Sequence, residues 1–305
     1  MSILVELPLE LYARDAFAGF QPTAGFELGT ARAMAWMSQL GYETAHPDKI
    51  ETICEAWGLR RPSLIANAPS PLPIARTRGV IAEGHGACIV AFAGTDPLIP
   101  ANWFTDFDFT VTPDDIHRGF ERAADKVWDE VSKALSARTE MPVFITGHSL
   151  GAALAVVTAD RALADTNLRA SAVYTFGMPR VGDAEFAQRY NDTLGAATFR
   201  LVHGDDIVAT VPPSSLGFRH VGRLLTCARA GCFPPDAQPS SGFTDDPPFV
   251  GSLVSGLRQG IADLLAGRLQ PTFRADSVGR LSGLLPPPIA DHLPDRYCHA
   301  FEPDI

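Results

Sequence analysis

A serine between two glycines constrains the fold of this chain more than any other feature. The stretch TGHSLGAAL, residues 146–154, places Ser149 between Gly147 and Gly151. The preceding PVFIT is short and apolar, as is typical of a buried strand, and the following AALAVVTADRALA has the apolar content of a packed helix. A sharp strand-to-helix turn brings its two backbones so close that larger side chains would clash. The stretch therefore predicts a strand, a tight turn that exposes the Ser149 hydroxyl, and a helix.

Strand and helix patterns alternate on both sides of this turn. Two helices are predicted within residues 29–59, and two apolar runs joined by Gly84-His85-Gly86 predict a hairpin. A long helical pattern begins at Pro113, and residues 171–204 read as strand, helix and strand. This alternation predicts an α/β protein with a parallel or mixed sheet between helical layers.

The length of 305 residues fits one large domain, 1–305, with insertions better than two ordinary domains. Residues 223–288 are rich in loop-forming and proline-rich sequence, so we expect an insertion there. Within it, FVGSLVSGLRQGIADLLAGRL has apolar residues at helical spacing. A helix packed on the core and a cap over an apolar site both remain open as interpretations.

The charge balance excludes one class of partner. A net charge of −10 and a pI near 5.2 argue against nucleic acid, whose binding depends on clustered Lys and Arg. No run approaches membrane-spanning length. MSILVELPLELYARD shows no standard secretion signal, so a cytoplasmic protein is the default expectation, with non-standard secretion left open. The sequence does not determine the oligomeric state.

Five cysteines, an odd number, do not form a disulfide framework, and we interpret most of them as buried thiols. Cys227 and Cys232 are close enough in sequence for a local disulfide, or for a zinc site with His220 and a further ligand. Neither signal is specific, and no metal is assigned.

A serine attacks poorly unless a general base removes its proton and an acid orients that base. In hydrolases with this turn the chain order is serine, acid, histidine. Asp205 and Asp206 follow an apolar strand, where one could be the acid and the other a turn former. His292, in a loop after rigid prolines, fits the order best, with His220 and His299 as alternatives.

Several motifs, taken in order, resemble those of the class 3 lipases, which are α/β-hydrolases. FAGTD is similar to the family's oxyanion segment, NWFTD to its lid hinge, HRGF to His-x-Gly-Phe and GHSLG to its elbow. FGMPRVGD, DDIVATVPP and MSQLGYE match further family motifs, and DHLPDRY is similar to the ending of bacterial members. The resemblance covers residues 30–220 and a short stretch around His292. It implies an α/β-hydrolase fold, with a mostly parallel central sheet flanked by helices and a lid segment. Residues 223–288, the expected insertion in the C-terminal half, have no counterpart in the family pattern.

The resemblance also implies roles. Ser149 becomes the nucleophile, Asp206 the acid and His292 the base, while Thr95 and Leu150 form the oxyanion hole. No metal or organic cofactor is implied. The chain departs from the family pattern where alanine replaces its usual Arg before the oxyanion glycine and its Pro after Asp-Ile-Val.

The segment DPLIPANWFTDF occupies the position of the family's lid, and its apolar residues would contact acyl chains or a lipid interface. These residues are Leu98, Ile99, Trp103, Phe104 and Phe107. The alternative is that they merely cap the core.

The function implied is a serine carboxylic-ester hydrolase, a lipase cleaving acylglycerols or other lipid esters through a Ser-Asp-His triad. An esterase acting on short-chain, aryl or feruloyl esters, a phospholipase, and an acyltransferase would use the same triad. An idle hydrolase fold that serves as a binding module is the alternative from another class.

If the lid interpretation is correct, replacing Leu98 and Ile99 with Ser should lower turnover of long-chain esters more than turnover of butyrate esters, because only long chains need the apolar face. Initial rates on nitrophenyl palmitate and nitrophenyl butyrate measure this. An equal loss on both substrates would contradict a lid.

Overall fold

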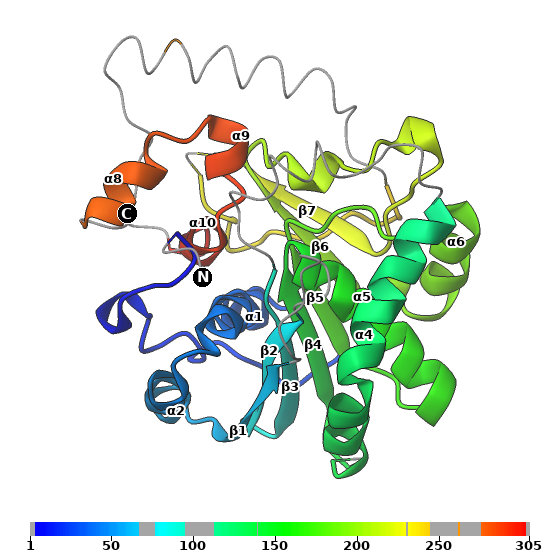
Figure 1. Ribbon diagram of the computed structural model, residues 1–305, viewed down its shortest axis with the longest axis horizontal. Coiled ribbons are helices and arrows are strands. Elements are labelled where there is room, and N and C mark those ends of the chain that lie inside the picture. The colour runs from blue at the N-terminus through cyan, green and yellow to red at the C-terminus, as the bar shows by residue number, and fades with distance from the viewer. Residues whose placement is uncertain are drawn as a thin grey trace.

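The computed structural model describes residues 4–66, 77–94, 113–138, 140–229, 231–244, 262 and 276–302. Within these ranges seven strands form one sheet, in which the strand order follows the chain order from β1 to β7 (Figure 1). The strands are β1 (Arg60–Ala66), β2 (Arg78–Gly84), β3 (Ala87–Phe92), β4 (Val143–His148), β5 (Ala172–Phe176), β6 (Thr198–His203) and β7 (Arg223–Cys227).

The sheet is antiparallel at one side and parallel across the rest. β1 pairs with β2, and β2 with β3, in antiparallel ladders. From β3 to β7 every pair is parallel. The predicted hairpin is therefore β2 and β3, and the prediction of a mostly parallel sheet is confirmed.

Helices cover both faces of this sheet. Their bounds are α1 (Leu28–Leu40), α2 (Pro47–Ala56), α4 (Pro113–Ser136), α5 (Leu150–Thr166), α6 (Ala184–Thr193), α8 (Ser277–Ser282), α9 (Pro287–Ala290) and α10 (Pro294–His299). None of the helices in the described ranges is long and apolar enough to span a bilayer.

The strand order decides which helices lie on which face. When consecutive parallel strands are neighbours, right-handed crossovers place all the connecting helices on one face. α4, α5 and α6 are these connections, and they lie together on one side of the sheet (Figure 1). The opposite face is covered by α1, from before the sheet, and α10, from after it.

Alternation along the strands divides the core into two layers. In β3, Ile89 and Ala91 pack in the layer with α1 and α10, whereas Val90 and Phe92 pack in the layer with α4 and α5. Successive strand side chains point to opposite faces, so a strand buried on both faces is apolar throughout. All six residues of β3 are buried accordingly.

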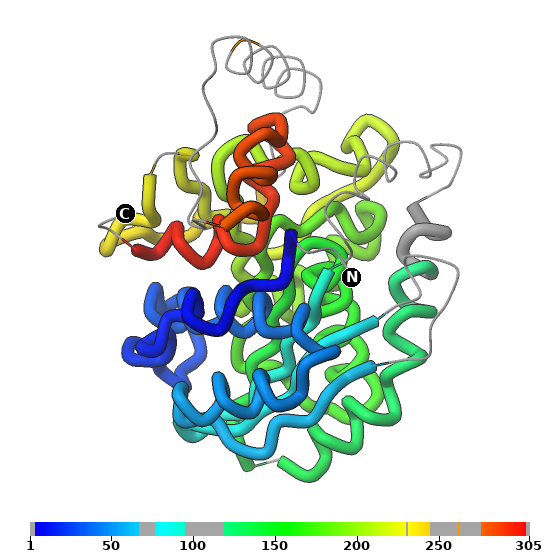
Figure 2. The backbone as a smooth tube through the Cα atoms, turned by 60° about the vertical axis from the view of Figure 1, so that its left-hand side comes forward, coloured from blue at the N-terminus to red at the C-terminus, as the bar shows by residue number. Residues whose placement is uncertain are grey.

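The two ends of the described chain lie against each other on the face covered by α1 and α10. Figure 2 shows the amino-terminal segment running beside the carboxyl-terminal helices. Arg32 of α1 donates from Nε to Glu302 Oε1 at 2.8 Å, and its Nη2 lies 2.8 Å from Asp15 Oδ1. This contact fixes the segment after α10 against α1.

The structure describes only part of the predicted insertion at residues 223–288 and none of the residues assigned to the lid. β7, the last strand of the sheet, is formed by the first residues of the 223–288 segment. The apolar helical pattern at 249–269 lies outside the described residues, apart from residue 262, and so do the residues assigned to the lid. A single domain with an insertion at 223–288 stays a prediction.

The strand, tight turn and helix at the serine are formed as predicted, but Ser149 is buried, so the predicted exposure of its hydroxyl is wrong. β4 ends at His148, Ser149 has φ 59° and ψ −127°, and α5 begins at Leu150. A Cβ on Gly147 would lie 2.1 Å from the carbonyl oxygen of Gly151, and a Cβ on Gly151 would lie 2.4 Å from that of Phe92. Both glycines are required because backbone atoms fill the space of a side chain.

Replacing Gly151 with Ala should destabilise the protein by about 3 kcal/mol, because backbone atoms of β3 and Ala93 must move to admit the methyl group. Gly119→Ala, in α4, is the matched control, since a Cβ there meets nothing within 4 Å. It should leave stability unchanged or raise it by up to about 1 kcal/mol. Urea unfolding of both variants measures the difference, and equal stabilities would contradict the close-packed turn.

Candidate active site

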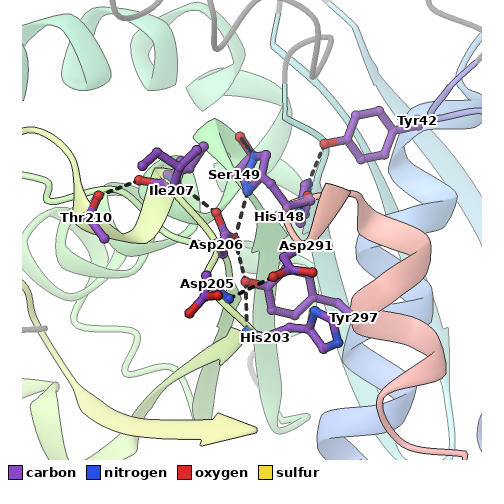
Figure 3. A network of polar contacts seen from close by, with 12 residues as sticks. Tyr42, His148, Ser149, His203, Asp205, Asp206, Ile207, Thr210, Asp291 and Tyr297 are labelled. Carbon is purple, nitrogen blue, oxygen red and sulfur yellow. Dashed lines mark hydrogen bonds and ion pairs between the residues drawn. The ribbon is translucent and has the colours of Figure 1, made fainter. Parts of the chain in front are cut away.

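The three residues predicted to act together lie in one chain of hydrogen bonds. His292 Nε2 is 2.8 Å from Ser149 Oγ, and His292 Nδ1 is 2.8 Å from Asp206 Oδ2. All three side chains are buried. Figure 3 shows Ser149 and Asp206 on this network.

The parallel strands explain how distant residues meet. Ser149 follows β4 and Asp206 follows β6, with β5 between them, so both residues lie at the carboxyl edge of the sheet. The Ser149 N–H donates to Phe176 O, at the end of β5, at 2.8 Å. His292 lies in the short link between α9 and α10, each of which has proline in its first turn.

The Asp206 carboxylate is held on both oxygens. Oδ1 accepts the Val208 N–H at 2.8 Å, and Oδ2 accepts from His292 Nδ1 and from the Tyr297 hydroxyl, the latter at 2.5 Å. A proton on Nδ1 leaves Nε2 of a neutral imidazole free to accept from the Ser149 hydroxyl. Burial and the adjacent Asp206 raise the pKa of Tyr297 well above its ordinary value, so its hydroxyl stays a donor.

The neighbouring acid occupies a different environment. The Asp205 side chain is 56% exposed and pairs with Arg229 at 2.7 Å. The structure therefore separates the two adjacent aspartates that the residue pattern left open, and it is Asp206 that contacts His292.

A second buried network runs behind the serine through His148 (Figure 3). His148 Nε2 is 2.8 Å from the carbonyl oxygen of His292, which can only accept, so Nε2 carries the proton. Nδ1 then accepts from the Tyr42 hydroxyl at 2.7 Å, and the Tyr42 oxygen accepts the Gly94 N–H at 2.9 Å. Burial, followed by the nearby His292, lowers the pKa of His148 well below its ordinary value. A neutral His148 thus ties the backbone of His292 to the residue before Thr95.

The remaining candidates are placed as follows. Leu150 is the first residue of α5, whose first-turn N–H groups lack intrahelical acceptors. Thr95 lies outside the described residues, as do the five residues assigned to the lid. His220 Nε2 contacts the carbonyl of Ala209, and His299 packs edge-on against Trp36, so the structure brings neither to Ser149 through these contacts.

Other residues shape the site without having been assigned a role from the sequence. Tyr297 and Tyr42 were present in matched motifs, but their contacts with Asp206 and His148 were not predicted. Arg180, in FGMPRVGD, is buried and donates from Nη1 to Pro212 O at 3.0 Å, which supports the loop that follows Asp206. Arg229 had no signal in the sequence.

The cysteines are all free thiols. Burial raises the pKa of Cys227 to about 12, which keeps it protonated, and the Cys232 thiol contacts the Glu302 carbonyl at 2.9 Å. Over the described ranges, no group of three or more His, Cys, Asp or Glu side chains could hold a metal ion.

Comparison with known proteins places these features in a family context. Residues 89–216 match the model of the family described as lipase (class 3). A secreted mono- and diacylglycerol lipase of Malassezia globosa is 34% identical over 45% of this chain and 50% of its own length. A secreted mono- and diacylglycerol lipase of Fusarium solani is 39% identical over 39% of this chain and 38% of its own length.

A solved structure described as a triacylglycerol lipase whose catalytic centre is a serine protease triad is also similar. It is 28% identical, with a TM-score of 0.52, over 66% of this chain and 80% of that one. Together with the mostly parallel sheet, this likeness shows an α/β-hydrolase fold. The chain spans about half or less of the two curated relatives above.

Two expectations from the sequence change in the light of these relatives. The default expectation of a cytoplasmic protein is wrong, because the two fungal relatives are named as secreted. That expectation rested only on the lack of a recognisable secretion signal in the amino-terminal stretch. The core and the site would fold from the same residues in either compartment, so nothing else in the sequence bears on localisation. The relatives described here are fungal and lend no support to a bacterial-type subgroup.

The buried His148 predicts a pH dependence of stability. Its folded pKa lies below the unfolded value of about 6.5, so below that pH the unfolded chain takes up a proton that the folded state refuses. As the pH decreases below about 6.5, the free energy of unfolding should therefore decrease. His148 should contribute up to about 1.4 kcal/mol of this decrease per pH unit. In His148→Gln the slope should be shallower by that amount.

Urea unfolding between about pH 7.5 and 5.5 measures the slope. His46→Gln is the control, because the His46 side chain is 52% exposed. A slope in His148→Gln equal to that of the wild type would contradict a neutral His148 in the folded state.

Proposed function

We propose that this chain, whose residues 89–216 match the class 3 lipase model, belongs to that family and hydrolyses carboxylic esters through an acyl-enzyme on Ser149. The observation that carries the proposal is the unbroken chain of contacts Ser149–His292–Asp206, with both distances at 2.8 Å. The comparisons support the same chemistry, because the related solved structure is described as a lipase with a serine protease triad.

In this mechanism the Ser149 hydroxyl attacks the ester carbonyl carbon while His292 Nε2 takes its proton. Asp206 stabilises the imidazolium that results, and Val208 and Tyr297 hold the carboxylate in place. His292 then returns the proton to the departing alcohol oxygen, which leaves the acyl group on Ser149. Water, deprotonated by the same imidazole, adds to the acyl carbon and releases the acid and the free serine.

The oxyanion of each tetrahedral intermediate needs donors that are already in position. Leu150 supplies one, because its N–H lies in the first turn of α5, where the helix dipole is also favourable. Thr95 is proposed as the second on the basis of the family motif, and Gly94, the residue before it, is held by Tyr42.

Acylglycerols are the proposed substrates, because the relatives are named for mono-, di- and triacylglycerol lipase activity. The apolar residues from Leu98 to Phe107 are proposed to form a lid, and the part of the 223–288 insertion that follows β7 is proposed to cap the site. Secretion of the relatives supports action outside the cell. Only the carboxyl-terminal motif DHLPDRY, which contains His292, supports placing the chain in a bacterial-type subgroup.

Short-chain or aryl esters, phospholipids and acyl transfer to another alcohol are the competing activities, because the same triad serves them all. A binding module without activity is the competing class. Chain-length preference separates the first group, and labelling of Ser149 separates the second.

Initial rates on nitrophenyl butyrate and nitrophenyl palmitate, with Ser149→Ala as the blank, test the proposal. A lipase should turn over palmitate at least comparably and gain rate above its solubility limit. Butyrate preference with simple saturation would favour the esterase. Rates equal to the blank, with no fluorophosphonate adduct on Ser149, would contradict catalysis altogether.

The two adjacent aspartates provide a matched pair for the triad assignment. Asp206→Asn should lower kcat by about 10⁴-fold, because the amide no longer fixes the tautomer and orientation of His292. Asp205→Asn should cost far less, since Asp205 contacts Arg229 rather than His292. A larger loss in Asp205→Asn would reverse the assignment.

A further inference from the structure

We propose that Arg229 is a positioning residue, whose guanidinium holds together the two loops that carry Asp206 and His292. It binds Asp205 and Asp291, the residues that immediately precede the triad acid and base. The proposal rests on the proposed function of Ser149, and it names a device that controls the geometry of that site.

Arg229 forms hydrogen bonds with the carboxylates of both Asp205 and Asp291. Arg229 Nε donates to Asp291 Oδ1 at 3.0 Å and Oδ2 at 2.8 Å, and its Nη2 donates to Asp205 Oδ2 at 2.7 Å. The Asp205 backbone N–H also donates to Asp291 Oδ2, at 2.8 Å (Figure 3). One guanidinium and one N–H therefore link both loops through Asp291.

Burial makes this cluster different from an ordinary surface ion pair. The Asp291 side chain is only 4% exposed, whereas those of Arg229 and Asp205 are 29% and 56% exposed. An exposed ion pair contributes little to stability, but removing the partner of a buried charge is far more disruptive. Loss of Arg229 would leave the Asp291 carboxylate buried with the Asp205 N–H as its remaining donor among these contacts.

The two loops need such a link because they come from different parts of the fold. Asp205 follows β6 in the sheet, Asp291 follows α9, and Arg229 follows β7. A backbone bond from Ile207 N to Pro288 O, at 3.2 Å, also joins the loops, but at a longer distance. A fork of donors fixes direction as well as distance, which a single ammonium cannot do.

Removing Arg229 is expected to slow the chemical step of the reaction rather than weaken substrate binding. A misplacement of about 1 Å between reacting groups can cost about 100-fold in rate. Arg229 acts through Asp205 and Asp291, so its removal should lower kcat and leave KM for a soluble ester nearly unchanged.

Arg229→Met tests the proposal, with Arg161→Met as the matched control. Both arginine side chains are 29% exposed, and each binds two carboxylates, which for Arg161 are Asp125 and Asp165. Arg161 lies on α5, away from the loops of the site. On nitrophenyl butyrate, kcat of Arg229→Met should fall by about 10- to 100-fold, and that of Arg161→Met by less than about twofold.

A second readout does not depend on turnover. The His292 Nδ1 proton, bonded to Asp206, should give a low-field proton NMR resonance that reports their contact. It should weaken or shift in Arg229→Met and stay unchanged in Arg161→Met. Ethylguanidinium should restore kcat in Arg229→Ala, whereas ethylammonium should not, because only the former has the fork of donors.

The outcomes separate the two proposals. A wild type that neither hydrolyses esters nor labels at Ser149 would overturn the proposed function, while the NMR signal would still test the link. An unchanged kcat and an unchanged resonance in Arg229→Met would overturn the role of Arg229. An equal loss of kcat in Arg161→Met would overturn it as well. So would a loss of kcat in Arg229→Met that accompanies lower thermal stability while the resonance stays unchanged.

Discussion

A buried carboxylate must be satisfied on every side, and the Asp206 carboxylate is satisfied only by segments that the fold brings together. Its own loop supplies Val208, the link after α9 supplies His292, and α10 supplies Tyr297. Because an unpaired buried charge is so unfavourable, the loop after β6 and the carboxyl-terminal helices are stable only as one unit. The strained Ser149 turn, fixed between β4 and α5, then meets an imidazole whose orientation is already set.

Around this contact the structure uses two kinds of support. Behind the serine, His148 is neutral and joins Gly94 and Tyr42 to the backbone of His292 by hydrogen bonds alone. On the other side, Arg229 joins Asp205 and Asp291, the residues next to Asp206 and His292. Uncharged donors suit the fully buried position of His148, where an extra charge would be costly, whereas the charge of the partly exposed Arg229 is balanced by the carboxylates of Asp205 and Asp291.

Much of the fold followed from the sequence because local patterns specified it. The glycines around Ser149, the hairpin at Gly84 and the alternation of strands and helices are short-range signals, and each is found in the structure. The chain order of serine, acid and histidine reduced the number of candidate acids and histidines. The family resemblance then indicated Asp206 in preference to Asp205. Tyr297, Tyr42 and Arg229 lie 91, 106 and 62 residues from their partners Asp206, His148 and Asp291, so no local pattern predicts these contacts.

The coverage of the sheet has a consequence for how the site is completed. Crossover helices cover one face as the strands are made, but the face on which Phe144, Tyr174 and Phe199 lie is closed jointly by α1 and α10. During synthesis, a nascent chain that has left the ribosome as far as β7 already holds Ser149 and Asp206 but has no His292. The apolar face beside them also lacks its α10 cover at that stage. The contacts from Ser149 through His292 to Asp206 and the burial of that face are therefore completed together, when residues 287–302 dock.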